Sequence, residues 1–234
     1  MKNIGIIGAM KVEIEAIKAA MEIIETKQAL GTEYHIGRLS GKDVVLAWAG
    51  VGKVNAAICA QKMIDSMGVD AIVSVGVAGG IKSGLAIGDV VIATDLLYHD
   101  MNAVSFGYSP GVIPRMPESN FITDDTLSSA AQAAGNNIIG RTDNKVVSGR
   151  MATGDQFIND NEDKARIAQE FDAACVEMES AAIAHTCYLN GIPFTAIRTI
   201  SDSADDSADF VFQEFLGMAA ERAGNIIVDM IKRL

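Results

Sequence analysis

The 234 residues are enough for one large α/β domain or two small ones, and 49% hydrophobic with 21% charged residues suits a globular protein with a sizeable core. The formal net charge of −11 argues against DNA or RNA as a partner, because nucleic-acid binding needs clustered Lys and Arg. Three cysteines without a CxxC pair indicate a reducing compartment, and no apolar run approaches the roughly 18 residues of a membrane span. A cytoplasmic protein without membrane contact is expected.

Short apolar runs alternate with longer runs of helical periodicity along the chain. In chain order we expect a strand at Ile4–Ile7, a helix at Lys11–Ile24, a strand at Val44–Ala49, a helix at Lys53–Met67, strands at Ala71–Val77 and Val90–Leu97, a helix at Asp125–Ala134, a strand at Lys145–Ala152, a helix at Glu162–Phe171, a strand at Phe194–Ile200 and a helix at Phe210–Lys232. This alternation implies crossover connections and a mixed, mostly parallel β-sheet flanked by helices. With no linker or repeat, residues 1–234 are expected to form a single α/β domain.

The stretch Tyr98–Phe121 has no clear periodicity. A loop of this length inside a compact domain usually serves function or forms an interface. Phe106, Tyr108 and Pro114 favour packing of this loop over disorder, so the loop is a candidate interface.

The run 176-VEMESAAIAH-185 places Glu177 and Glu179 in an otherwise apolar, alanine-rich segment. Buried, unpaired carboxylates are unfavourable or shift their pKa upward, so these two must be solvated, paired elsewhere or kept for chemistry. Residues two apart in an extended chain point to the same side, and both could therefore face a cleft. For Glu177, a place at a helix start is at least as good an explanation as substrate contact.

Several familiar motifs are absent or incomplete. The string 50-GVGKVN-55 lacks the spacing of a Walker loop and is better explained as a strand-to-helix turn, although such a turn can line a pocket. The acidic run 202-DSADDSADF-210 fails the register of an EF-hand. His35, His99 and His185 lack metal-ligand spacing, and no Ser or Cys has the context of a nucleophile. No metal and no cofactor are expected.

Three carboxylates remain at junctions between predicted elements. Glu13 follows the first strand, Glu179 lies near a strand-to-helix switch, and Asp202 follows the last strand. Carboxylates in apolar surroundings can be tuned for general acid and base catalysis. Spacing alone leaves it open whether these three mark an active site or are structural.

Eight short blocks in order give the chain a family resemblance. The blocks are 4-IGIIGAM-10 with Glu13, 50-GVGKV-54, 76-GVAGG-80, 98-YHD-100, 106-FGY-108, 154-GDQFI-158, 176-VEMES-180 and 198-RTISDSAD-205. Over nearly its whole length the chain resembles the 5′-methylthioadenosine/S-adenosylhomocysteine nucleosidases. The resemblance implies a nucleoside phosphorylase-like fold, a homodimer, and hydrolysis of the N-glycosidic bond of purine nucleosides. The expected substrates are 5′-methylthioadenosine, S-adenosylhomocysteine and 5′-deoxyadenosine.

The resemblance also implies roles for individual residues. Glu13 matches the base that deprotonates the attacking water, and Asp202 matches the acid that protonates adenine N7. Glu179 matches the carboxylate that holds the ribose hydroxyls. The other matching positions are Met178 beside the sugar, Phe157 and Ile158 at the adenine, Arg198 and Ser201 in support of Asp202 and the water, Val77 and Gly79 in the glycine-rich strand end, Val51 and Phe212 at the 5′-thio group, and Phe106 and Pro114 contributed by a partner subunit.

One position departs from the family pattern. Family members commonly carry Ser where this chain has Val77, so the water is left to Glu13 and Arg198. Three other functions stay open at this stage: a nucleoside phosphorylase, a hydrolase for another 5′-modified purine nucleoside, and a non-catalytic nucleoside-binding module. An intact set of Glu13, Glu179 and Asp202 argues against the last of these, because binding adenine needs no base directed at water.

Overall fold

The computed structural model describes residues 1–140, 142–206 and 208–234. Its elements in chain order are β1 (Asn3–Gly8), α1 (Lys11–Ala20), β2 (Glu22–Ala29), β3 (Thr32–Leu39), β4 (Lys42–Trp48), α2 (Lys53–Met67), β5 (Ala71–Gly80), β6 (Val90–Tyr98), the short 3₁₀ turn η1 (Val104–Phe106), β7 (Phe121–Ile122), α3 (Asp125–Ile139), β8 (Val146–Thr153), α4 (Asn161–Phe171), β9 (Ala173–Glu177), α5 (Ser180–Asn190), β10 (Phe194–Asp202) and α6 (Ala208–Arg233). None of the described helices is long and apolar enough to cross a membrane.

One mixed sheet joins all ten strands and closes partly on itself. β10 pairs with both β5 and β6, while β6, β8, β9 and β5 pair in turn, so these five strands form a closed ring. The mixed, helix-flanked sheet is confirmed. Five of the ten pairings between described strands are parallel, so the two directions are more evenly balanced than the expected mostly parallel sheet.

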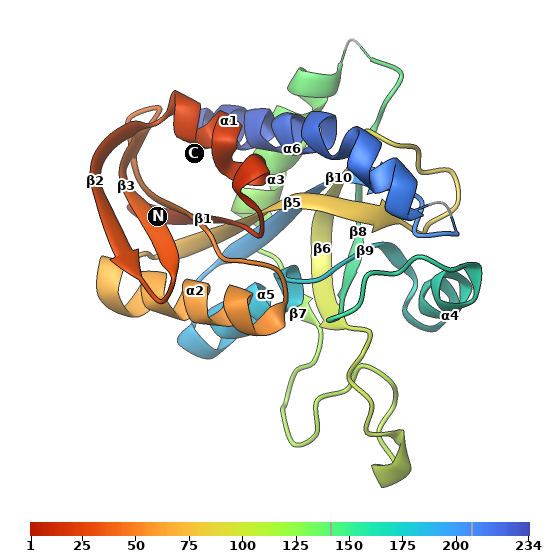
Figure 1. Ribbon diagram of the computed structural model, residues 1–234. Helices are drawn as coiled ribbons and strands as arrows, with labels where there is room; N and C mark the ends of the chain where they lie inside the picture. The colour runs from red at the N-terminus through yellow and green to blue at the C-terminus, as the bar shows by residue number, and fades with distance from the viewer. Residues whose placement is uncertain (141, 207) are drawn as a thin grey trace.

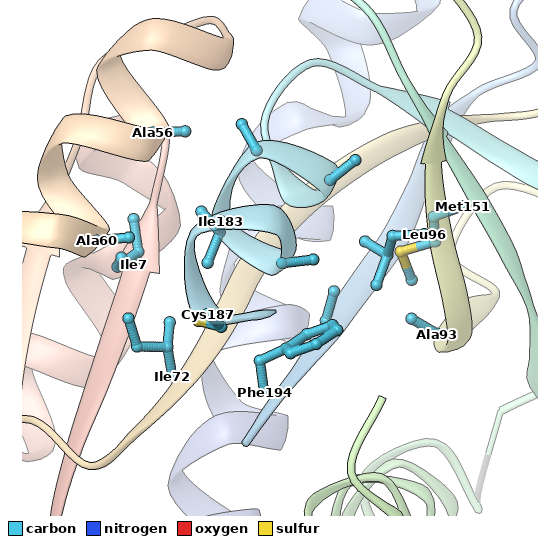
Figure 2. Packing of buried hydrophobic residues seen from close by; sticks show 14 of the residues in the cluster. Ile7, Ala56, Ala60, Ile72, Ala93, Leu96, Met151, Ile183, Cys187 and Phe194 are labelled. Atoms are coloured by element: carbon cyan, nitrogen blue, oxygen red, sulfur yellow. The ribbon is translucent and has the colours of Figure 1, made fainter. Parts of the chain in front are cut away.

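Helices cover the sheet on two faces (Figure 1). On one face α1, α3 and α6 pack together over a core that includes Ile4, Ile6 and Ile17. On the other face α2 and α5 lie against the sheet, and Figure 2 shows Ala60 of α2 and Cys187 of α5 close to the strands. The small side chains on α2 and α5 allow close packing of helix on sheet, which explains the many alanines in these segments.

The hairpin β2–β3 was missed by the sequence analysis, and the first helix ends earlier than expected. Helical spacing of isoleucines suggested a helix as far as Ile24, but α1 ends at Ala20 and Ile24 lies 67% exposed on β2. β2 is exposed along most of its length, so it carries no apolar alternation to reveal it. The turn Leu30-Gly31 has positive φ at both residues, as a two-residue type I′ hairpin requires, but Leu is not one of the residues that signal such a turn in a sequence.

The remaining predicted elements are present: α2 has its predicted bounds, and the others have one or both ends shifted by a few residues. The loop between β6 and β7 contains only η1 and extends away from the body of the molecule (Figure 1). The turn Gly50–Gly52 leads from β4 into α2 as expected, with Gly52 at φ 99°. Positive φ favours glycine there, because a Cβ would be strained.

Candidate active site

A cavity of about 250 Å³ lies where β1, β5, β9 and β10 end. Its walls come from the residues after β1, the turn before α2, the end of β5, the segment 176–179, the end of β10 and the first turns of α6. Most of the lining is apolar, and the polar exceptions include Glu13, Glu179 and Asp202. Open α/β sheets bind ligands at such strand ends, so this cavity is the candidate site.

Glu13 is held by backbone groups from two strand ends. Its Oε2 accepts from the N–H groups of Ala9 and Met10, each at 2.8 Å, and its Oε1 accepts from Val77 N–H at 3.0 Å. A Cβ on Gly76 would stand 2.4 Å from Glu13 Oε1, so the glycine makes room for the carboxylate. Burial raises the pKa of Glu13, opposed by Arg198 and the three N–H groups. Once ionised, Glu13 is therefore a stronger base than an exposed glutamate.

Asp202 ends β10 at a bulge in its pairing with β5. Its Oδ1 accepts from Ala204 N–H at 2.8 Å and its Oδ2 from the Ser201 hydroxyl at 2.9 Å. A Cβ on Gly79 would come within 2.9 Å of Asp202 Oδ1, so this position also requires glycine. Burial raises the pKa of Asp202, which favours the protonated form that a general acid needs.

Glu177 and Arg198 form a buried ion pair at the edge of the cavity. Arg198 Nη2 lies 2.7 Å from Glu177 Oε2, and both side chains are 2% exposed. Glu177 also accepts from Ser180 N–H at 2.7 Å and from the hydroxyl of Thr153. Burial acts to raise the pKa of Glu177, but Arg198 and these donors hold it below its ordinary value. Glu177 is thus a fully satisfied anion at a helix start.

Glu179 lies two residues further on with far fewer partners. Its side chain accepts from Gly52 N–H at 2.8 Å, which ties it to the turn before α2. Burial and the nearby charge of Glu177 raise the pKa of Glu179 to about 8. Because Gly52 N–H occupies only one acceptor site of Glu179, the carboxyl group can still hydrogen-bond to hydroxyl groups inside the cavity.

The cavity that contains these carboxyl groups also has an apolar wall. The Phe157 ring packs edge-on against Phe212 of α6, with 5.6 Å between ring centroids, and remains 41% exposed. Ile158 and Met178 complete this side of the cavity. An aromatic face beside carboxyl groups suits a flat heterocycle joined to a polyol.

A family model for the phosphorylase superfamily matches residues 3–232. A 5′-methylthioadenosine/S-adenosylhomocysteine nucleosidase of Listeria monocytogenes is 39% identical, over 99% of this chain and 100% of its own length. The chain belongs to the phosphorylase superfamily and, within it, to the 5′-methylthioadenosine/S-adenosylhomocysteine nucleosidase family.

Solved structures extend the likeness to three dimensions. The crystal structure of the nucleosidase of this family from Neisseria meningitidis, in complex with methylthio-immucillin-A, has a TM-score of 0.95 and 38% identity, with 100% of both chains covered. The futalosine hydrolase of Helicobacter pylori has a TM-score of 0.92 and 31% identity, over 100% of this chain and 98% of that one. The family fold is thus shared by hydrolases with different names.

Eleven of the fourteen site residues expected from the family resemblance line the cavity. They are Glu13, Val51, Val77, Gly79, Phe157, Ile158, Met178, Glu179, Ser201, Asp202 and Phe212. The lining also includes Ala9, Met10, Ala78, Gln156, Val176 and Glu177. Each of these six residues lies within one of the matching sequence blocks. The sequence could therefore have indicated them as lining residues by their position beside an expected site residue.

Three expected residues lie elsewhere. Arg198 was expected beside the water and Asp202, but its guanidinium pairs with Glu177 and is not part of the cavity lining, because a buried carboxylate draws the nearest cation. Phe106 is 83% exposed on the extended loop, and Pro114 lies on the same loop, so neither lines the cavity of its own chain.

Proposed function

We propose that this enzyme hydrolyses the N-glycosidic bond of 5′-methylthioadenosine and S-adenosylhomocysteine, and of 5′-deoxyadenosine, releasing adenine and the 5-substituted ribose. The observation that carries the proposal is one cavity lined by Glu13, Glu179 and Asp202 together with the aromatic pair Phe157 and Phe212. The relatives named above, which match along the full chain, support it.

In this mechanism Glu13 activates the attacking water. Three backbone donors orient its carboxylate, and its raised pKa makes it a good proton acceptor. Val77 offers an N–H to Glu13 and no side-chain hydroxyl to the water. Since Arg198 is engaged with Glu177, Glu13 is the main group that positions the water, and Arg198 acts by holding Glu177 in place.

Asp202 protonates adenine N7 as the bond to ribose breaks, because adenine is a poor leaving group as an anion. Phe157 stacks on the base and the backbone of Ile158 reads its edge, with Ser201 orienting Asp202. Glu179 holds the ribose hydroxyls, and in its ionised form it stabilises the oxocarbenium-like charge that develops on the sugar. Met178 packs beside the sugar, while Val51 and Phe212 surround the 5′-thio group.

Water rather than phosphate is the proposed nucleophile. Phosphate needs Arg, Lys or several amides with hydroxyls, and none of the described residues that line the cavity is Arg or Lys. Repulsion between Glu13 and a phosphate charge at about 4 Å amounts to roughly 4 kcal/mol for an effective dielectric near 20. Adenine release from methylthioadenosine should therefore proceed in phosphate-free buffer and yield free 5-methylthioribose. A rate proportional to added phosphate, with a sugar 1-phosphate as product, would contradict this.

The likeness to futalosine hydrolase favours one alternative, a hydrolase for a different 5′-modified purine nucleoside. Both activities would use the same acid, base and ribose carboxylate, so they differ only in what the 5′ end of the cavity accepts. Rates with methylthioadenosine, S-adenosylhomocysteine and futalosine, measured under one set of conditions, decide between them.

A homodimer is also proposed. Val104 and Phe106 on the extended loop are exposed, as are Val54 and Ile58 on α2. Exposed apolar residues of this kind mark interfaces, and a partner would supply Phe106 and Pro114 to the 5′ end of the cavity. Full activity at a light-scattering mass near 24.7 kDa, that of one chain, would contradict the dimer.

The cytoplasm is the proposed compartment, and residues 1–234 are proposed to act as one domain. The cysteines Cys59, Cys175 and Cys187 are free and buried, as expected in a reducing environment. α6 near the end of the chain packs on α1 near its beginning, so the two ends belong to the same core.

A further inference from the structure

Three charged side chains form a cluster beside the cavity without lining it. The Lys53 ammonium hydrogen-bonds to Asp100 and lies 3.7 Å from Asp155 Oδ2. It also lies over the Tyr98 ring, 5.4 Å from the centroid. The three residues come from separate segments: the first turn of α2, the end of β6 and the segment after β8.

Backbone hydrogen bonds make Asp155 the centre of this cluster. Asp155 Oδ1 accepts from Lys53 N–H at 2.8 Å, and Asp155 N–H donates to Asp100 Oδ2 at 2.9 Å. A Cβ on Gly52 would stand 3.2 Å from Asp155 Oδ1, a tight approach at a residue that already has φ 99°. The turn before α2 and the segment after β8 are therefore held against each other.

Asp155 joins the turn before α2 to the segment after β8, and both of these segments contribute to the cavity. On one side Gly52 N–H donates to Glu179 Oε1 at 2.8 Å. On the other side Asp155 is followed directly by Gln156, Phe157 and Ile158, which line the cavity. Among the described residues, no hydrogen bond is made by the backbone of residues 156–158. Asp155 therefore anchors the start of this segment, and beyond it Asn159 Nδ2 donates to Asp209 Oδ2 at 3.2 Å.

We propose that Lys53, Asp100 and Asp155 are positioning residues that set the distance between the ribose carboxylate Glu179 and the base-stacking ring Phe157. This rests on the proposed function for the roles of Glu179 and Phe157. None of the three touches the substrate. They act through Gly52 on one side and through the chain that follows Asp155 on the other, so that the purine and the sugar of one ligand are gripped together.

The main test compares Asp155→Ala with Asp155→Asn. Alanine removes the acceptor for Lys53 N–H, whereas asparagine keeps an acceptor oxygen in the same place. Asp155→Ala should raise KM for methylthioadenosine about tenfold or more with a smaller change in kcat, because binding common to ground state and transition state is lost. Asp155→Asn should stay within about threefold of the wild type. Asp43→Ala, which breaks the exposed pair with Arg38, is the matched control and should leave both constants unchanged.

A second pair of variants covers the case in which Asp155→Ala does not fold. Lys53→Met keeps every backbone hydrogen bond and removes only the ammonium between two carboxylates, so KM should rise at least about threefold. Lys27→Met, which breaks an exposed pair with Glu25, is its control. A KM within twofold of the wild type in folded Asp155→Ala, or in Lys53→Met where only that variant folds, overturns the proposal.

Binding of a non-hydrolysable analogue of methylthioadenosine, measured by calorimetry, separates this proposal from the proposed function. Its affinity should weaken in Asp155→Ala in parallel with the change in KM, because the analogue carries both a purine and a sugar. If the wild type binds the analogue but does not cleave methylthioadenosine, the proposed function fails and the titration still decides on Asp155. Equal affinity for the analogue in wild type and folded Asp155→Ala overturns the positioning role.

Discussion

Glu177 and Glu179 stand two residues apart and are both 7% exposed, yet the pKa of Glu177 is lowered and that of Glu179 is raised to about 8. Glu177 belongs to a buried polar group at the edge of the cavity, with Arg198, Ser180 and Thr153 around it. Glu179 faces the cavity with Gly52 N–H as its hydrogen-bond donor. Equal burial therefore has opposite effects on the two pKa values, because the Arg198 charge and several donors act on Glu177, whereas Glu179 has one donor and the Glu177 charge beside it.

The opposite pKa shifts of Glu177 and Glu179 separate a region that serves stability from a region that serves catalysis. A carboxylate whose partners all belong to the protein stabilises the fold, and its removal leaves Arg198 as an uncompensated buried charge. The carboxyl groups that open on the cavity, Glu13, Glu179 and Asp202, keep raised pKa values that suit acid and base chemistry. Substitutions in the first region should affect stability, and substitutions in the second should affect turnover or pH dependence.

The largest effect on turnover is expected for Asp202→Asn. Asparagine can still accept from Ala204 N–H but cannot deliver a proton to adenine, so kcat should fall at least about 10²-fold. The midpoint of thermal unfolding should stay close to that of the wild type, because no buried charge is left unpaired. Near-normal turnover of methylthioadenosine by this variant would remove Asp202 from the role of acid.

The largest effect on stability is expected for Glu177→Gln. Gln cannot compensate the buried Arg198 charge, and breaking a buried ion pair of this kind costs about 3–5 kcal/mol of unfolding free energy. Asp229→Asn is the matched control, since its pair with Arg233 on α6 is more exposed and should contribute at most about 1 kcal/mol. Urea denaturation measures both. Equal losses in the two variants would show that Glu177 and Arg198 contribute no more than a surface pair.

A pH-dependent effect is expected for Glu179→Gln. The pKa of Glu179 is raised to about 8 in the fold, whereas the ordinary pKa of glutamate, expected in the unfolded chain, is 4.5. Between these values the folded state binds more protons, so this group makes stability fall as pH rises, by at most about 1.4 kcal/mol per pH unit. Gln removes this dependence. The stability of Glu179→Gln relative to wild type should therefore rise from pH 5 to 8 and then level off.

Glu25→Gln on the exposed strand β2 provides the control for that measurement. Its stability relative to wild type should change little across the same pH range, because Glu25 is exposed in the fold. A pH-independent difference for Glu179→Gln as well would show that Glu179 ionises in the folded protein as it does in the unfolded chain.

Much of the fold was accessible from local pattern. α2 was predicted at its observed bounds, because its helical periodicity begins after the glycine turn and ends at Gly68 in a left-handed conformation. The hairpin β2–β3 escaped because β2 is an exposed edge strand whose residues need no alternation. The closed ring of five strands could not be read from the chain, since the pairing of β10 with both β5 and β6 depends on sheet curvature.

The sequence by itself determined that Glu13, Glu179 and Asp202 stand at junctions between elements, and the family blocks identified their neighbours. The junctions can be found from the sequence because the end of a strand depends on the residues next to it in the chain. Only the tertiary structure decided which carboxylate is neutralised. Arg198 lies 21 residues from Glu177 in the chain, and β10 places its guanidinium against the Glu177 carboxylate. Charge pairing depends on distances of a few ångströms in space, and spacing along the chain does not encode them.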